Sequence, residues 1–255
     1  MLSQFSVADQ AALVTGASSG IGRAIAERFA QDGADVLVCS REQENVDPVA
    51  AGIREAGGTC VAVECDVRDR EAVAAMVETA EAELGGLDCL VNNAGASFMA
   101  GFEDISPNGW EAILDVNLTG TLNCCQAAGD ALADGGGTVI NMASVAGMQG
   151  APYMSHYGAA KAGIINLTRT LAYEWAGDGV RVNCIAPGYV ATPGVEEQMG
   201  VSADGVDRDE VQRRLGEPAE IADVAQFLAS RAASYLTGET VAPQGVPDIV
   251  EEPTV

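Results

Sequence analysis

The sequence predicts a single α/β domain, in which a mostly parallel sheet of seven strands carries helices on both faces. Short apolar runs alternate with longer helical patterns along the whole chain. A glycine-rich turn joins the first apolar run to the first helical pattern. The 255 residues, 48 % of them hydrophobic, are enough for one domain with a sizeable core.

The elements follow one another in a regular order. Strands are expected where short apolar runs end in Gly, Asp, Asn or Ser, at residues 11–14, 35–40, 59–65, 88–91, 137–142, 181–185 and 239–242. Helices are expected where apolar residues recur at helical spacing, at residues 21–31, 46–56, 70–84, 110–133, 155–176 and 219–230. Residues 187–216 are polar, and we expect this segment to be irregular. Strands that are separated by helices pair in parallel, which predicts a doubly wound sheet.

The domain is expected to span residues 1–246, followed by an acidic tail at 247–255. The chain contains no apolar run long enough for a membrane span, and its first residues lack the basic and apolar regions of a signal peptide. We therefore expect a soluble protein of the cytoplasm.

Acidic residues dominate the charge. Thirteen Lys and Arg residues face thirty-seven Asp and Glu residues, for a net charge of −24. Such a surface repels nucleic acids and anionic membranes, so neither is expected as a partner. The charge serves either ordinary solubility or adaptation to high salt, where counterions screen the repulsion. Lys161 is the only lysine, and the lack of other lysines fits a surface adapted to high salt.

The seven cysteines form no Cys-x-x-Cys pair, and His156 is the only histidine. A Cys/His metal site is therefore not expected. We interpret the cysteines as buried free thiols in a reducing compartment. His156 is expected to be a structural or pocket-edge residue and not a catalytic one, because it adjoins Tyr157 and neighbours on a helix do not share a face.

Two motifs carry chemistry. The turn from Thr15 to Gly22 follows a strand and opens a helix, as in turns that bind a dinucleotide pyrophosphate; an ordinary strand–helix turn is the alternative. Tyr157 and Lys161 lie four residues apart on a predicted helix and so share a face. A cation near a phenol lowers its pKa, which would make Tyr157 a usable acid or base. The alternative is an ordinary tyrosine beside a solvated lysine.

The joint pattern resembles one family. Thr-Gly-x-x-x-Gly-x-Gly at 15–22, Asn-Asn-Ala-Gly at 92–95 and Tyr-x-x-x-Lys at 157–161 occur in this order, with Ser144 upstream of the tyrosine. With Pro187 and Gly188 after the sixth strand, the set resembles the compact branch of the short-chain dehydrogenase/reductase family. Within it, the pattern is similar to 3-oxoacyl-carrier-protein reductases and to sugar and alcohol dehydrogenases. The resemblance spans nearly the whole chain and implies a Rossmann-type fold.

The resemblance also implies roles for individual residues. The implied catalytic residues are Asn117, Ser144, Tyr157 and Lys161. Tyr157 would donate a proton to the carbonyl oxygen, Ser144 a second hydrogen bond, and Asn117 would hold a proton-relaying water. The implied cofactor-binding residues are Gly16, Ser18, Ser19, Gly20, Ile21, Gly22, Ser40, Arg41, Asp66, Val67, Asn92, Ala94, Gly95, Tyr157, Lys161, Pro187, Gly188, Val190 and Thr192.

The end of the second strand indicates which cofactor is preferred. NAD-preferring relatives place an acid there for the ribose 2′-hydroxyl, whereas this chain has Ser40 followed by Arg41. A serine and an arginine can bond a 2′-phosphate. We therefore expect NADP, with NAD as the alternative.

The leading hypothesis is an NADP-dependent oxidoreductase that transfers a hydride between the nicotinamide and a ketone, a 3-oxoacyl carbonyl or a secondary alcohol. One alternative is an NAD(P)-dependent sugar or polyol dehydrogenase, and another is a non-catalytic dinucleotide-binding redox sensor. The expected partner is a small-molecule substrate, and the resemblance implies a homotetramer. Arg208, Arg213 and Arg214 are expected either to meet an anionic substrate or to pair with nearby acids.

Overall fold

The structure is a computed structural model that describes residues 2–199 and 214–246. Residues 247–255, expected as an acidic tail, and residues 200–213 of the segment expected to be irregular lie outside the described residues. Arg208 and Arg213 lie there as well. The described residues contain no helix with both the length and the apolar character needed to cross a membrane.

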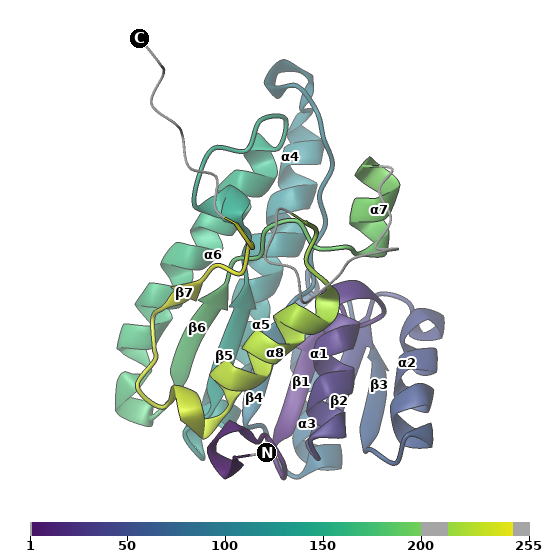
Figure 1. Ribbon diagram of the computed structural model, residues 1–255, viewed down its shortest axis with the longest axis vertical. Helices are drawn as coiled ribbons and strands as arrows, with labels where there is room; N and C mark the ends of the chain where they lie inside the picture. Colours follow the sequence, from purple (N-terminus) through teal and green to yellow (C-terminus); the bar gives the residue numbers. More distant parts are fainter. Residues whose placement is uncertain (1, 200–213, 247–255) are drawn as a thin grey trace.

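Seven strands form one parallel sheet (Figure 1). Their order across the sheet is β3-β2-β1-β4-β5-β6-β7, and every neighbouring pair is parallel. The strands are β1 (Ala11–Thr15), β2 (Asp35–Ser40), β3 (Cys60–Glu64), β4 (Cys89–Asn92), β5 (Thr138–Met142), β6 (Arg181–Ile185) and β7 (Thr240–Val241). The predicted Rossmann-type, doubly wound sheet is confirmed.

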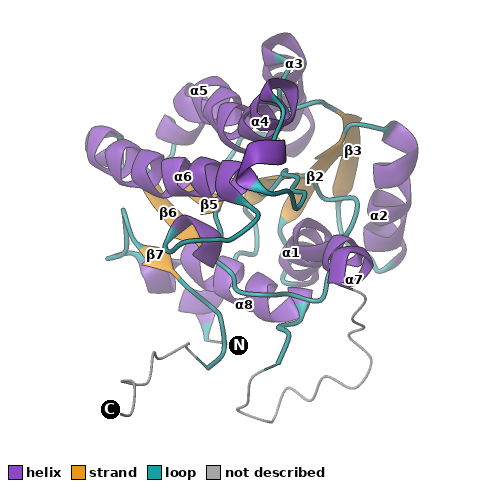
Figure 2. Ribbon diagram, turned by 90° about the horizontal axis from the view of Figure 1, so that it is seen from above, coloured by secondary structure: helices purple, strands orange, loops and turns teal. Residues whose placement is uncertain are grey.

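The described residues form eight α-helices, most of which pack against the two faces of the sheet. They are α1 (Gly20–Gln31), α2 (Gln43–Glu55), α3 (Arg70–Leu84), α4 (Pro107–Leu114), α5 (Gly120–Ala133), α6 (Ser155–Glu174), α7 (Pro193–Met199) and α8 (Pro218–Ala229). One core cluster joins the sheet to α1, α2 and α8, and a second joins it to α3, α5 and the end of α6. Figure 2 shows these helix groups on opposite sides of the strands.

The strand sequences produce both cores. Neighbouring residues of a strand point to opposite faces, and the central strands are apolar on both. Val14 and Val38 belong to the core beside α1 and α8, whereas Leu13 and Leu37 belong to the core beside α3 and α5. The strands β1 to β3 build outward to one side and β4 to β7 to the other. Ligands bind at the carboxyl ends of the strands where this order reverses.

One predicted helix is divided. Residues 110–133, expected as a single helix, form α4, a π-helical turn from Asp115 to Thr119, and α5. The expected start was also wrong, because Ser106 caps a helix that begins at Pro107: the Ser106 hydroxyl accepts a hydrogen bond from the Gly109 N–H at 3.1 Å. Proline at the first helical position fits this start, since no intrahelical partner is needed there.

A short helix occupies part of the segment expected to be irregular. The helix α7 begins at Pro193, and the Thr192 hydroxyl accepts a hydrogen bond from the Val195 N–H at 3.4 Å. Threonine before proline is a start signal for a helix, and it was overlooked because the segment as a whole is polar.

Candidate active site

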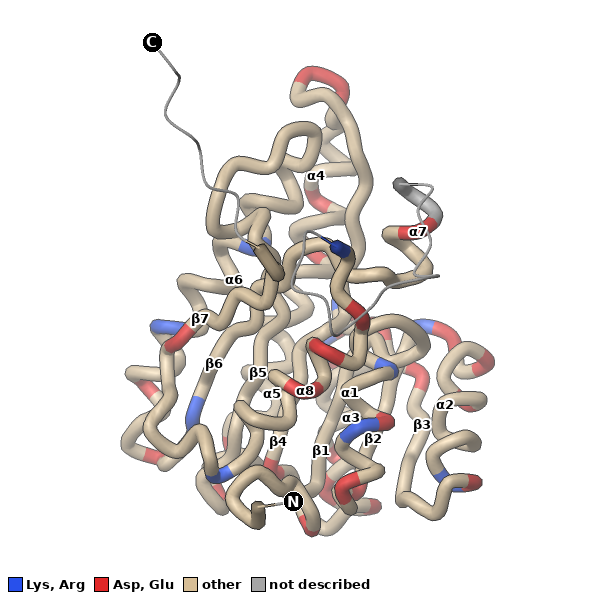
Figure 3. The backbone as a smooth tube through the Cα atoms, in the orientation of Figure 1, with Lys and Arg blue, Asp and Glu red and all other residues tan. Residues whose placement is uncertain are grey.

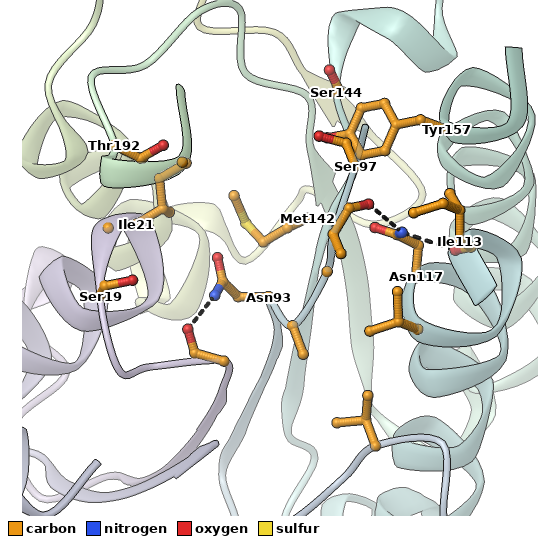
Figure 4. A pocket seen from close by; sticks show the side chains of 18 of the residues that line it. Ser19, Ile21, Asn93, Ser97, Ile113, Asn117, Met142, Ser144, Tyr157 and Thr192 are labelled. Carbon is orange, nitrogen blue, oxygen red and sulfur yellow. Dashed lines mark hydrogen bonds between the residues drawn. The ribbon is translucent and has the colours of Figure 1, made fainter. Parts of the chain in front are cut away.

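A cavity of about 850 Å³ opens at the carboxyl edge of the sheet, beside the point where the strand order reverses. One wall comes from the turn after β1 and the start of α1, with Ser19 and Ile21, and from Thr192 just before α7 (Figure 4). The facing wall carries Ser144 and Tyr157, whose side chains lie close together in the same view. The cavity therefore has one end suited to a nucleotide and another, the chemical end, that carries candidate catalytic side chains.

The glycine-rich turn packs closely against the backbone of the Asn-Asn-Ala-Gly loop. Gly16 has a φ of +63°, and a Cβ there would lie 2.7 Å from the Ala94 Cα, so no side chain fits. The Asn93 amide donates to the carbonyl oxygens of Thr15 and Gly16, both at 3.0 Å. The turn is thereby joined to the Asn-Asn-Ala-Gly loop, and its open glycine backbone suits a pyrophosphate at the start of α1.

The cavity brings together all but two of the residues that the sequence assigned to the cofactor and to catalysis. Gly22 and Asn92 do not line it. Gly22 lies beneath the turn, where a Cβ would be 2.3 Å from the Asn93 Nδ2, so it shapes the turn rather than touching a ligand.

The Asn92 side chain does not face the cavity. Its Nδ2 donates to the Asn141 Oδ1 at 2.9 Å and to the Cys125 Sγ at 3.2 Å, within the core. The Asn141 Nδ2 in turn donates a hydrogen bond to the Thr168 hydroxyl at 3.0 Å. Asn92 faces the α5 side of the sheet, as Leu90 does, because alternate residues of a strand share a face, and Asn93 lines the cavity in its place.

The far part of the nucleotide end of the cavity is lined by Ser40, Arg41, Asp66 and Arg68. The Arg68 guanidinium binds the Asp66 carboxylate, with Nη2 to Oδ2 at 2.6 Å, and this lowers the pKa of Asp66. The Ser40 hydroxyl donates to the Glu42 carbonyl oxygen at 2.7 Å. Arg68 was not among the residues expected in the site, although its place two residues after Asp66 could have indicated it.

Positive charge gathers in the cavity although the chain is strongly acidic. The lining side chains include Arg41, Arg68 and Lys161, and among the described residues Asp66 is the only lining carboxylate. Figure 3 shows acidic residues over the surrounding helices and loops instead. The cavity thus suits an anionic ligand such as a dinucleotide, whatever the net charge of the whole protein.

Tyr157 and Ser144 form the chemical end. Tyr157 lies in the first turn of α6, and Ser144 follows β5 and caps a short 3₁₀ turn through the Ala146 N–H. Burial raises the pKa of Tyr157 above its ordinary value, and the hydrogen bond with Ser144 offsets this only in part. The sequence-based expectation of a lowered tyrosine pKa is therefore wrong for this arrangement. A raised pKa keeps the phenol protonated at neutral pH.

Lys161 is buried one helical turn after Tyr157. Its Nζ donates to the Met142 carbonyl oxygen at 2.8 Å and lies 5.4 Å from the centre of the Tyr157 ring. Burial lowers the pKa of Lys161 to about 8. The ammonium therefore remains mostly charged at neutral pH, although burying the charge opposes folding. The shared helical face predicted from the spacing of the two residues is confirmed.

Asn117 lies in the π-helical turn between α4 and α5. Its Nδ2 donates to the carbonyl oxygens of Ala96 at 2.8 Å and Ile113 at 2.9 Å, while its buried Oδ1 has no partner. A Cβ on Gly95 would lie 2.6 Å from this Oδ1 and 3.5 Å from the Lys161 Nζ. An unpaired acceptor and a buried ammonium therefore lie against the same glycine, where a side chain would collide with the Asn117 Oδ1.

His156 does not enter the cavity. It is fully buried, and its ring meets the Phe98 ring edge-on with centroids 4.2 Å apart. The expected structural role fits this packing. No group of three potential metal-binding side chains occurs within residues 2–199 and 214–246.

The fold and this site define a dinucleotide-dependent oxidoreductase. The chain belongs to the short-chain dehydrogenase/reductase family and acts on alcohol or ketone groups: a family model described as enoyl-(acyl carrier protein) reductase matches residues 16–245. The sequence is 42 % identical over 241 residues to short-chain reductase protein NovJ of Streptomyces niveus, covering 91 % of this chain and 92 % of that protein.

Two further relatives are named as a reductase and as a dehydrogenase. The chain is 37 % identical over 237 residues to a 3-oxoacyl-(acyl-carrier-protein) reductase of Thermotoga maritima, covering 91 % of this chain and 95 % of that one. The structure superimposes with a TM-score of 0.86 on a putative NAD(P)-dependent gluconate 5-dehydrogenase from Beutenbergia cavernae, which was solved with bound NADP. The two are 39 % identical, and the match covers 95 % of this chain and 98 % of that one.

Proposed function

We propose that this protein is an NADP-dependent reductase of ketones or 3-oxoacyl carbonyls, which also oxidises the corresponding secondary alcohols. The observation that carries the proposal is that Tyr157, Ser144 and Lys161 line one end of a cavity whose other end is lined by the glycine-rich turn, Arg41 and Arg68. The neighbouring 3-oxoacyl-(acyl-carrier-protein) reductase supports this class of substrate.

The residues have distinct roles in this reaction. A bound nicotinamide cofactor supplies the hydride. Tyr157, protonated because burial raises its pKa, donates its proton to the carbonyl oxygen. Ser144 provides a second hydrogen bond to the oxygen as negative charge develops there. Lys161 holds positive charge beside the phenol, and the free Asn117 Oδ1 supports a water-mediated path from Lys161.

The preference for NADP rests on the adenosine end of the cavity. Arg41 and Arg68 both line it, and Asp66, the single lining carboxylate among the described residues, is paired with Arg68. Ser40, where a carboxylate would repel a 2′-phosphate, is neutral. The bound NADP in the gluconate dehydrogenase relative is consistent with this reading.

Arg41→Asp tests the cofactor preference. The variant should lose affinity for NADPH and gain relative affinity for NADH, because a carboxylate repels a 2′-phosphate and accepts bonds from a 2′-hydroxyl. The dissociation constants of both cofactors, measured by fluorescence titration, give the ratio. Arg23→Asp on the exposed side of α1 is the matched control, since Arg23 pairs only with Glu27 among the described ion pairs. An equal ratio in both variants contradicts the assignment.

The substrate-side loops are largely apolar. Met99, Phe102, Met148 and Tyr153 are exposed there, and the Ala100 N–H donates to the Tyr153 carbonyl oxygen at 2.9 Å, which joins the two loops. Such a rim favours an apolar ketone or acyl chain over a sugar. NADPH oxidation across 3-oxoacyl thioesters, alicyclic ketones and sugars tests this. Turnover of sugars alone would establish the sugar dehydrogenase alternative, and cofactor binding without turnover the redox sensor.

We further infer a cytoplasmic homotetramer. All seven cysteines are free thiols, as in reducing compartments. Leu122 on α5 and Tyr173 on α6 expose apolar surface that association would cover. Analytical ultracentrifugation should give a mass of four times 26.1 kDa. A monomer at micromolar concentration would exclude the tetramer.

A further inference from the structure

Three thiols lie beneath the nucleotide end of the cavity and have no part in the proposed chemistry. Cys39 belongs to β2, Cys65 follows β3, and Cys124 lies on α5; all three are buried in the core cluster between the sheet and α3 and α5. Cys65 alone of the three also lines the cavity. Cys65 is therefore the thiol of the three that borders the space a reagent in the cavity would occupy.

Cys39 and Cys65 contact each other. In the β2–β3 pair Cys39 is opposite Val63, so Cys65, two residues on, points to the same face of the sheet. The Cys65 N–H donates to the Ser40 carbonyl oxygen at 2.8 Å, and the two thiols are close enough that each shifts the pKa of the other. Cys39 also accepts a hydrogen bond from the backbone N–H of Gly16. The thiol pair thus links the glycine turn to the segment that carries Asp66.

The two thiols differ in reactivity. The interaction with Cys39 lowers the pKa of Cys65, whereas the same interaction together with burial raises the pKa of Cys39. The thiolate is the reactive form of cysteine. Cys65 lines the cavity and Cys39 does not, so an oxidant in the cavity meets Cys65 first, with Cys39 as the neighbouring thiol.

We propose that Cys65 and Cys39 form a peroxide-sensitive modification site, in which oxidation closes a disulfide between them and weakens cofactor binding. The Cys65 thiolate attacks a hydroperoxide oxygen and becomes a sulfenic acid, releasing hydroxide or alkoxide. The Cys39 thiol then displaces the sulfenic oxygen as water, and the sulfur–sulfur bond forms. Two thiols are oxidised by two electrons, and one peroxide is reduced.

The disulfide must distort the site. Neighbouring strands lie about 4.8 Å apart and rise about 3.3 Å per residue, so Cα atoms two residues out of register are about 8 Å apart. A disulfide holds its Cα atoms within about 6.8 Å. Closure therefore draws residue 65 toward β2, moves Asp66 and Val67 with it, and removes the thiol that accepts from the Gly16 N–H.

The experiment compares the protein with and without saturating NADPH during brief treatment with a slight excess of hydrogen peroxide. Free thiols are then alkylated and the peptides are identified by mass spectrometry. Without NADPH we expect a peptide pair joined through Cys39 and Cys65, two hydrogen atoms lighter than the reduced peptides, and at least several-fold weaker NADPH binding that dithiothreitol restores. With NADPH present during treatment, we expect both thiols to remain free.

Variants separate this site from general oxidation. Cys39→Ser should stop at a Cys65 sulfenic acid that dimedone traps. Cys60→Ser is the matched control, because Cys60 is buried at the other end of β3 and in the other core; it should leave the crosslink unchanged. A link between Cys65 and Cys124, no crosslink, or equal oxidation with and without NADPH overturns the proposal. If NADPH does not bind at all, the proposed function fails while the crosslink still forms.

Discussion

Lys161 shows how one residue combines chemistry with a cost in stability. Its ammonium is buried, anchored to the Met142 carbonyl oxygen, and close to the Tyr157 ring. Burial lowers its pKa from 10.5 to about 8, and such a difference opposes folding by about 3 kcal/mol at neutral pH. The site keeps this cation in spite of its cost, as expected for a group that catalysis needs.

Lys161→Met should remove this pH dependence. Between pH 8 and 10.5 the unfolded chain still binds the proton that the folded protein has released, so the free energy of unfolding of the wild type rises with pH. The variant lacks this contribution. We expect the wild type to gain about 2 to 3 kcal/mol on the variant between pH 7 and 10 in urea denaturation. A difference that stays constant across this range would contradict the buried charge.

The same pKa predicts how activity depends on pH. In the free enzyme Lys161 loses its charge above about pH 8, and the cation beside Tyr157 is lost with it. The kcat/KM for carbonyl reduction, which reports groups of the free enzyme, should therefore fall on the alkaline side of pH 8. A profile without an inflection between pH 7 and 9 would exclude Lys161 as the titrating group.

At the residue scale the sequence predicted which side chains meet, but not how each is oriented. The order of the motifs was sufficient to predict that Tyr157, Lys161 and Ser144 lie in one site, and all three line the cavity. It did not reveal that Asn92 turns into the core, because facing a cavity or a core depends on strand register and neighbours such as Asn141. The raised pKa of Tyr157 was also missed, since burial is a property of the assembled site.

The element before α6 is a turn with a strained residue. The Met154 N–H donates to the Ala151 carbonyl oxygen at 3.1 Å, Pro152 takes the second position, and Tyr153 the third with a φ of +65°. This is the pattern of a type II turn, whose third position favours glycine. The Tyr153 ring is 63 % exposed, so packing does not explain the strain.

Tyr153→Gly should stabilise the protein. Glycine adopts a positive φ without the cost that a side chain incurs, but it loses more chain entropy on folding, so we expect a net gain of roughly 0.5 to 1 kcal/mol. Tyr153→Ala is the matched control, because it removes the ring and keeps the strain. Urea denaturation midpoints measure both. An alanine variant that is as stable as the glycine variant would show that the turn is unstrained.

At the element scale, periodicity predicted the seven strands and most helices because apolar spacing determines which face is buried. It joined α4 to α5, since a π-helical turn changes the hydrogen-bond register without interrupting the apolar pattern. Such turns often occur at functional sites, and this one carries Asn117. The short helix α7 was missed for lack of an apolar face long enough to recognise.

On the scale of the whole molecule, the surface is acidic while the cavity is cationic. The net charge of −24 opposes the compact state through self-repulsion, and salt screens this. The melting temperature should therefore rise between 0.1 and 1 M KCl, where the Debye length falls from about 10 to about 3 Å. A melting temperature that stays flat or falls would exclude adaptation to high salt.

The central claim is that Tyr157 delivers the proton for hydride transfer in a site that binds NADPH independently of that proton. Single-turnover oxidation of bound NADPH by a reducible ketone, with wild type and Tyr157→Phe side by side, tests it most directly. We expect the variant to bind NADPH with nearly unchanged affinity and to lose at least about a hundredfold in the rate of hydride transfer. A variant that binds NADPH and transfers hydride at close to the wild-type rate would contradict the claim.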